Sequence, residues 1–218
     1  MTSVELLNAC PRDDAKVEAL FSSGWPAFIS AGHLAKKHLP QVRERFTRFE
    51  LVVLDEDVPV AAGRAVLIQW NGAREGLPAG YGDSLRRALV KEEEDGATTR
   101  VVCAGQVHPD CTGAGLAGPL LGAFRDLSVT AGHEHVIVPL RPTVTPRYPL
   151  TPIDVYAAWT RGDGLLLDSR LRTHVRKGAR VLNVAPRSQV MTGTVVQWEE
   201  WTGMALPWSG EYVIPGGL

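Results

Sequence analysis

The sequence has few cysteines and no long apolar run. Its three cysteines, Cys10, Cys103 and Cys111, form an odd set without CxxC spacing. This argues against a disulfide framework or a structural zinc site and favours a reducing compartment. No segment approaches the 18 apolar residues of a membrane helix, and the first residues lack the basic and then apolar pattern of a signal peptide. We therefore expect a cytoplasmic protein without a membrane anchor.

Net charge is also nearly absent. The 218 residues carry 23 Lys and Arg against 24 Asp and Glu, a formal charge of −1. A nucleic-acid partner or a membrane surface would need a concentrated positive face, so both are disfavoured. Lysine is scarce beside arginine, five against eighteen. GC-rich coding explains this skew most simply, and a preference for bidentate anion binding is the alternative.

Length and a hydrophobic fraction of 44% predict one α/β or α+β domain over residues 1–218. The first fifty residues are predicted to be helical. A hairpin follows, with strands 49–54 and 58–70 around an acidic turn. The remaining predicted elements are helix 84–94, strand 100–109, helix 119–132, strand 135–140, a short helix over 154–160, a basic segment over 170–180, a final strand pair ending at 201, and a docked or edge-strand tail over 210–218.

The most informative segment is a glycine-rich turn between the strand over 100–109 and the next helix. Gly113, Gly115 and Gly118 match the GxGxxG pattern of dinucleotide-binding folds in form. Against that interpretation, the turn follows several earlier elements, and no acidic residue follows the next strand, "HVIVPL". A Walker loop is excluded because no Lys-Ser/Thr pair follows the glycines.

The segment "VHPDCTGAGLAGPLL" resembles the acyl-CoA motif of the GCN5-related N-acetyltransferase (GNAT) superfamily. The resemblance implies a mixed, mostly antiparallel sheet flanked by helices, with coenzyme A in the splay between the central strands. It implies that Val107 ends the strand that pairs with the pantetheine arm. The phosphates would be held by Thr112, Gly113, Ala114, Gly115, Leu116 and Ala117. Thr112 departs from the Arg or Gln usual at its position.

The C-terminal half resembles a narrower group, through segments such as "VPLRPTVTPRYPLTPIDVYAAW" and "RGDGLLLDSRLRTHVRKGAR". These are similar to GNAT-like loading domains of polyketide synthases of the curacin type, which decarboxylate malonyl-type thioesters and are proposed to deliver acyl groups to an acyl carrier protein. The resemblance implies four groups around the acyl end of the site: Trp25, Thr143, His174, and either Arg187 or Arg176.

The two chemistries need different residues. Amine acetylation needs an acid for the departing thiolate and a base for the ammonium. Tyr156 is the candidate acid, with simple packing as the alternative; Glu50 and Asp55 are candidate bases, although a solvated edge position is the favoured interpretation of both. Decarboxylation needs donors for the developing enolate, which His174 would supply while Thr143 or an arginine orients the carboxylate.

Other reactive side chains are interpreted as structural. His133 and His135 have one nearby carboxylate and are expected to be structural or exposed rather than zinc ligands, so no metal is expected. Cys111 has no histidine paired by spacing, which disfavours covalent catalysis. Three tryptophans would pack the C-terminal strands, with a wall of the acyl tunnel as the alternative for one of them: Trp198, Trp201 and Trp208. The remaining candidates are arginines that are solvated or meet the CoA 3′-phosphate or an acidic carrier protein, Arg141, Arg147, Arg172 and Arg176.

Together these features predict an acyl-CoA-binding acyltransferase that acts on an acetyl- or malonyl-type thioester in polyketide or related secondary metabolism. The alternative is a malonyl- or methylmalonyl-thioester decarboxylase. A second alternative is a non-catalytic acyl-CoA sensor, supported by the departure at Thr112. The expected partners are acyl-CoA and either an acyl carrier protein or a small amine, and an exposed C-terminal strand would permit a homodimer.

Overall fold

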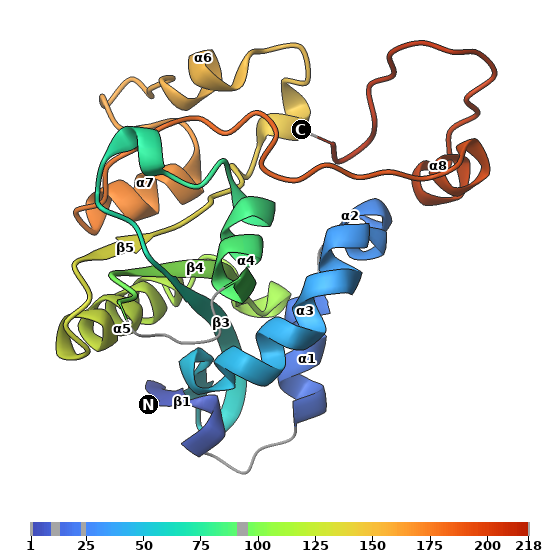
Figure 1. Cartoon of the computed structure of the whole chain (residues 1–218). Coiled ribbons are helices and arrows are strands. Elements are labelled where there is room, and N and C mark those ends of the chain that lie inside the picture. The colour runs from blue at the N-terminus through green and yellow to red at the C-terminus, as the bar shows by residue number, and fades with distance from the viewer. Residues whose placement is uncertain (1, 10–13, 23–24, 91–95, 218) are drawn as a thin grey trace. The chain divides into compact units, whose positions relative to one another are not determined.

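The computed structural model describes residues 2–9, 14–22, 25–90 and 96–217 (Figure 1). Its contacts group the chain into two compact units. Unit 1 comprises residues 1–24, 34–139 and 187–189, and unit 2 comprises residues 25–33, 140–186 and 190–218. The single domain over 1–218 stays a prediction. None of the described helices is long and apolar enough to cross a membrane.

Unit 1 is built on a five-stranded sheet in the order β1-β2-β3-β4-β5. Neighbouring strands are antiparallel except for β4 and β5, which are parallel. The predicted hairpin and the predicted strand–helix–strand unit are both confirmed. The strands are β1 (Thr2–Leu6), β2 (Leu51–Asp55), β3 (Val58–Ile68), β4 (Thr99–Val107) and β5 (His135–Ile137).

The prediction that the first fifty residues are helical is wrong for β1. This strand pairs with β2, from Thr2 opposite Asp55 to Leu6 opposite Leu51. Because its partner strand lies about fifty residues away in sequence, no local sequence pattern indicates that residues 2–6 form a strand. Farther along, α3 contains Pro40 within the helix. The helices are α1 (Asp14–Ser22), α2 (Ala27–Ala31), α3 (His33–Phe46), α4 (Tyr81–Val90), α5 (Ala117–Thr130), α6 (Ile153–Ala157), α7 (Ser169–Arg176) and α8 (Val195–Thr202), with single 3-10 turns at residues 7–9, 47–49, 74–76, 109–111 and 145–147.

Both faces of the sheet are covered, and β2 shows this most directly. Its side chains alternate between the faces, as in any strand. Leu51 and Val53 belong to one core with Phe124 of α5, whereas Val52 and Leu54 belong to a second core with residues of α1. A strand buried on both sides reads as a continuous apolar run, which is why the hairpin was easy to predict.

The predicted C-terminal strand pair is wrong, because residues 195–202 form α8. Thr194 caps this helix, and its side chain and that of Gln197 exchange hydrogen bonds with each other's backbone N–H. Gly203 ends the helix with a φ of 66°. The T-x-x-Q capping signal outweighs the strand preference of the two valines between them. The described part of the tail after Gly203 contains no strand either. The exposed C-terminal strand on which the homodimer prediction rested is therefore not present in these residues.

One glycine in β3 tests how tightly α5 packs on the sheet. A Cβ at Gly63 would lie 2.5 Å from the Phe124 ring, which is fully buried. We expect Gly63→Ala to lower the free energy of unfolding by about 1–3 kcal/mol through overpacking. Gly122→Ala is the matched control, since a Cβ there meets nothing within 4 Å and α5 should gain up to about 1 kcal/mol. Urea denaturation measures both, and equal effects would contradict the packing.

Candidate functional site

The sheet of unit 1 opens along one side of β4. β3 pairs with β4 over its full length, from Thr99 to Val107. β5 pairs only with its first three residues, ending at Val101 opposite Ile137. Residues 102–107 therefore have no partner strand on the β5 side within the described chain. This is the splay that the fold prediction expected, and it extends along β4 toward the glycine-rich loop.

The loop after β4 has a conformation that only glycine adopts readily. Gly113 and Gly115 have φ values of 90° and 78°. A Cβ at either position would meet nothing within 4 Å, so glycine is required by the backbone and not by lack of space. Residues 112–115 are exposed. The loop thus presents its backbone to solvent at the point where α5 begins.

Four N–H groups of this loop have no acceptor among the described residues; they belong to Gly113, Gly115, Leu116 and Ala117. They precede or begin α5, whose first turn has no acidic residue. Free N–H groups at the positive end of a helix dipole form a favourable environment for phosphate. Thr112 is exposed and adds no charge, so an anion here would depend on the backbone.

Glu50, a candidate base, is buried rather than solvated, which corrects the favoured interpretation. Only 5% of the residue is exposed. It accepts a 2.7 Å hydrogen bond from Arg64 Nε, while the same guanidinium reaches Glu18 and lies 3.8 Å from the Phe21 ring centre. The Glu50 carboxylate is therefore committed to a buried ion pair with Arg64. Asp55, in contrast, is exposed as expected.

In unit 2 the polar groups are organised by Asp168, which is only 1% exposed. Its Oδ2 accepts hydrogen bonds from the Thr143 N–H at 2.7 Å, the Val144 N–H and the Tyr156 hydroxyl at 2.9 Å. Its Oδ1 accepts from two N–H groups that begin α7. Burial alone would raise the pKa of Asp168, but these donors outweigh it and the pKa is lowered. The residue is therefore an ionised anchor for three chain segments.

Tyr156 lies on α6 as predicted, but its side chain is 1% exposed and its proton is donated to Asp168. Burial and this hydrogen bond raise the pKa of the phenol. The rings of Tyr148 and Trp159 pack around it at 5.9 and 5.5 Å between centroids. These contacts favour the packing alternative, and the acid role of Tyr156 stays a prediction.

His174 lies on α7 beside cationic groups. Burial, and then the charge of Arg170, lower the pKa of His174, so the imidazole is neutral at pH 7. Arg170 donates a 2.9 Å hydrogen bond to the Arg141 carbonyl oxygen, and the Arg141 guanidinium lies 5.7 Å from the Trp25 ring centre. Arg170 and Arg141 thus connect His174 with Trp25. The sequence analysis assigned neither arginine to the acyl end of the site.

The other predicted site residues are distributed as follows. Trp25, Thr143, Tyr156 and His174 all belong to unit 2, with Thr143 exposed and held by its N–H to Asp168. Arg176 is exposed at the end of α7. Arg187 is exposed and belongs to unit 1, as do Val107 and the glycine-rich loop.

The remaining reactive residues have structural surroundings. The His135 ring packs 4.9 Å from that of Trp70, which confirms a structural role. Burial raises the pKa of the Cys103 thiol to about 12; Cys10 lies outside the described residues. Across the described chain, no three His, Cys, Asp or Glu side chains could share a metal ion.

Of the three C-terminal tryptophans, two pack as predicted, but on α8 rather than on strands. Trp198 lies 5.3 Å from Trp201 and 5.6 Å from Phe28, measured between ring centroids. Trp208 is 82% exposed, so its predicted packing is wrong.

Sequence reasoning missed the roles of Asp168, Arg170 and Arg141. A signal for Asp168 was present, since Asp directly before "SRL" is a typical N-cap, and its side chain does accept from the Arg170 and Leu171 N–H groups. Nothing in the sequence could show that the same carboxylate also binds Tyr156, because that contact depends on tertiary structure.

The fold is shared with solved GNAT domains. No family model matches the sequence. The loading GNATL domain of CurA from Lyngbya majuscula superimposes with a TM-score of 0.64 at 18% identity, over 83% of this chain and 85% of that one. The GphF GNAT-like decarboxylase, solved in complex with isobutyryl-CoA, gives 0.61 at 20% identity over 83% and 86%. The chain therefore has the GNAT fold, as the resemblance of the glycine-rich segment implied.

A curated protein is similar in sequence as well. It is the arginine N-acetyltransferase avaD of Aspergillus versicolor, 28% identical over 206 residues, or 85% of this chain and 69% of that protein. The resemblance to the GNAT fold is thus confirmed by these structures, and the sequence relative adds a likeness to an N-acetyltransferase.

Asp168→Asn tests the anchor in unit 2. An amide has one oxygen, so either the α7 N–H groups or the Thr143 and Tyr156 donors would lose their acceptor, and we expect a loss of about 2–3 kcal/mol in unfolding free energy. The folded-state pKa lies below the ordinary 3.8, so this stabilisation is present above that pH and is lost as the pH falls through the folded pKa. Asp154→Asn, exposed on α6, is the control in denaturation at pH 7 and pH 3. Equal stability of the two variants at pH 7 would refute the anchor.

Proposed function

We propose that this protein is an acyl-CoA-dependent acyltransferase. The observation that carries the proposal is the set of four unbonded N–H groups in the glycine-rich loop, next to the unpaired part of β4. Two likenesses support it: a GNAT-fold structure that binds isobutyryl-CoA and a sequence relative named for N-acetyl transfer. Both point to a thioester as the donor of the acyl group.

In this proposal, residues 112–117 bind the pyrophosphate of CoA through the backbone. Val107 and the open edge of β4 provide backbone groups for the amides of the pantetheine arm, as an added strand would use them. His174, neutral at pH 7, is the group of unit 2 best suited to take a proton from an ammonium acceptor. The acyl group would pass either to an amine or to the thiol of a carrier protein. We place this reaction in polyketide or related secondary metabolism.

Decarboxylation of a malonyl-type thioester is the second candidate, and the surroundings of His174 favour it. A neutral imidazole donates one N–H, and Arg170 beside it disfavours the charged form. Such a donor suits the oxygen of a developing enolate. Trp25 and Thr143 would shape the acyl end, and an arginine, either Arg187 or Arg176, would hold the carboxylate.

The first test concerns the cofactor. Ala114 is exposed in the loop, so Ala114→Glu adds a negative charge beside the proposed phosphates without disturbing the core. We expect the Kd for CoA to rise roughly tenfold through charge repulsion. Val129→Glu changes α5 at its other end, where Val129 is 71% exposed, and should leave the Kd unchanged. Calorimetry measures both; equal Kd values would overturn the assignment of the loop.

The second test separates the reactions. The protein is incubated with acetyl-CoA and a panel of amines, and separately with malonyl-CoA, with products followed by mass spectrometry. We expect amine-dependent release of CoA, reduced about 10²–10⁴-fold in His174→Ala, as for loss of a general base. Thr173→Ala, on the neighbouring helix position, is the control. Acetyl-CoA formed from malonyl-CoA without any amine would instead establish the decarboxylase, and tight CoA binding with neither product would leave a sensor.

A further inference from the structure

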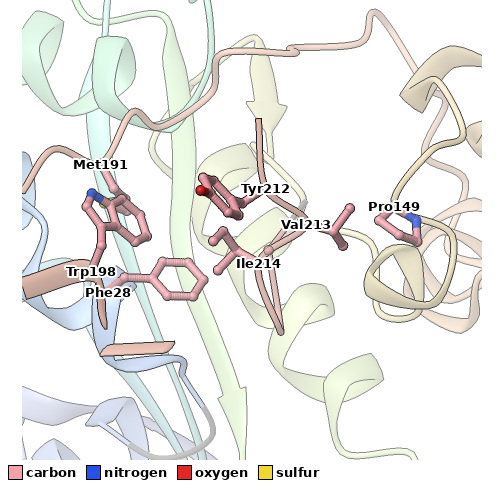
Figure 2. A pocket seen from close by; sticks show the side chains of 8 residues that line it. Phe28, Pro149, Met191, Trp198, Tyr212, Val213 and Ile214 are labelled. Atoms are coloured by element: carbon pink, nitrogen blue, oxygen red, sulfur yellow. The ribbon is translucent and has the colours of Figure 1, made fainter. Parts of the chain in front are cut away.

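Unit 2 contains an apolar pocket whose described lining includes none of the residues assigned to CoA binding or to catalysis. Its walls come mainly from α2, α8, residue 191 and the C-terminal tail after Gly203. Figure 2 shows Phe28, Met191 and Trp198 on one side, with Tyr212 and Ile214 facing them. The described lining residues are Phe28, Pro149, Met191, Trp198, Tyr212, Val213, Ile214 and Gly217.

The lining is suited to an uncharged, apolar ligand. None of the described lining side chains carries a charge. The only side-chain hydroxyl among them, that of Tyr212, is already bonded to the backbone of Trp208: it donates to the carbonyl oxygen at 2.8 Å and accepts from the N–H at 3.3 Å. A charged or strongly polar ligand would lose its hydration here without gaining side-chain partners, so an apolar ligand is favoured.

The size and the rings of the pocket favour an aromatic ligand. The volume is about 270 Å³, whereas an engineered apolar cavity of roughly 150 Å³ already binds benzene. The rings of Trp198 and Tyr212 line the pocket together with the Met191 thioether. The thioether is packed against the end of α2, since a Cβ at Gly32 would lie 2.6 Å from its sulfur. Aromatic rings and thioether sulfur both make favourable contacts with a further aromatic ring.

The tail that forms one wall is tied to the rest of unit 2 at two points. Glu199 on α8 accepts a 2.8 Å hydrogen bond from the Leu206 N–H. Nearer the C-terminus, Arg141 donates to the carbonyl oxygen of Gly216. The wall between these points is thus fixed by bonds that involve none of the lining side chains. The pocket is therefore formed before a ligand binds, as is usual for small-molecule sites.

Apolar surface continues from the pocket along the tail. Val213 in the lining is 53% exposed. Trp208, whose backbone bonds the Tyr212 hydroxyl, is 82% exposed. Exposed apolar side chains that adjoin a concave apolar site are typical of ligand-binding grooves. The tail thus offers an apolar ligand a surface at the pocket as well as a wall inside it.

We propose that this pocket, with the tail as one wall, binds a flat, uncharged aromatic ligand about the size of indole. The inference goes beyond the proposed acyltransferase, because the residues that would bind CoA belong to unit 1 and none of them lines this pocket. The ligand is bound without any covalent step. Its recognition depends on burial of apolar surface and on contacts between rings.

Two pairs of ring compounds test the class of ligand by calorimetry on the intact chain. Indole should bind at least about tenfold more tightly than adenine, a flat bicycle of similar size whose polar nitrogens would be buried without partners. Phenol should bind about 2–10-fold more tightly than cyclohexanol, which has the same hydroxyl but no aromatic ring. No binding of indole, or a Kd for adenine as low as that for indole, would overturn the apolar site. Equal Kd values for phenol and cyclohexanol would overturn its preference for aromatic rings.

A pair of valine variants tests the location of the ligand. Val213 lines the pocket and is 53% exposed, whereas Val181 is 51% exposed and does not line it. Val213→Asp should raise the Kd for indole about tenfold by placing a charge against the ligand, and should leave the Kd for CoA unchanged. Val181→Asp should change neither value. Equal Kd values for indole in the two variants would place the ligand outside this pocket and overturn the proposal.

A pair of glutamate variants tests the tail as a preformed wall. Glu199→Ala removes the acceptor of the Leu206 N–H and leaves every lining residue in place. The Kd for indole should rise roughly threefold or more, because the ligand must then order the tail as it binds. Glu200→Ala, at the exposed neighbouring position on α8, is the control and should leave this Kd unchanged. The same Kd in both variants would overturn the role of the tail.

Discussion

The structure of unit 1 depends on one incomplete pairing. β4 is bonded to β3 along its whole length, but β5 pairs with it only up to Val101. An unpaired strand edge presents backbone donors and acceptors that seek a partner. Here the open part of the edge leads directly to the glycine-rich loop, where Gly113 and Gly115 turn further N–H groups outward. Strand, loop and the start of α5 thus form a continuous row of backbone polar groups. An extended, amide-containing ligand with a phosphate at one end matches that row.

Unit 2 depends on a buried charge instead of a sheet. Asp168 receives hydrogen bonds from residues 143–144, from Tyr156 and from the start of α7. A buried carboxylate is tolerated only when its oxygens are satisfied, as they are here. By fixing the start of α7, Asp168 also fixes Arg170 and His174, which lie in the first and second turns of that helix. The lowered pKa of His174 follows from the position so obtained, and its proposed chemistry therefore depends on a carboxylate that is itself buried.

Patterns with a short range predicted well. The hairpin, the strand–loop–helix–strand unit and the glycine-rich loop were all correctly placed, because apolar runs and glycine at positive φ act over a few neighbouring residues. β1 was missed because its partner, β2, lies far away in the chain. Residues 195–201 were misread as strand because two valines suggested it, although the capping pair of Thr194 and Gln197 was available in the sequence. Both errors arise because the secondary-structure preferences of single residues were given more weight than distant strand pairing, for β1, and helix capping, for α8.

The sequence by itself was sufficient to predict the GNAT fold and the glycine-rich loop after β4, and to name His174 and Trp25 as candidate site residues. Only the tertiary structure decided which groups surround them. Arg141 and Arg170 were two of eighteen arginines until folding linked them to Trp25 and His174. Similarly, an apolar pocket is lined by Phe28 of α2 together with Tyr212 and Ile214 of the tail, segments that lie far apart in the sequence. Local preferences act between neighbours in the chain, whereas burial, charge neutralisation and cavity shape arise between segments that meet only after folding.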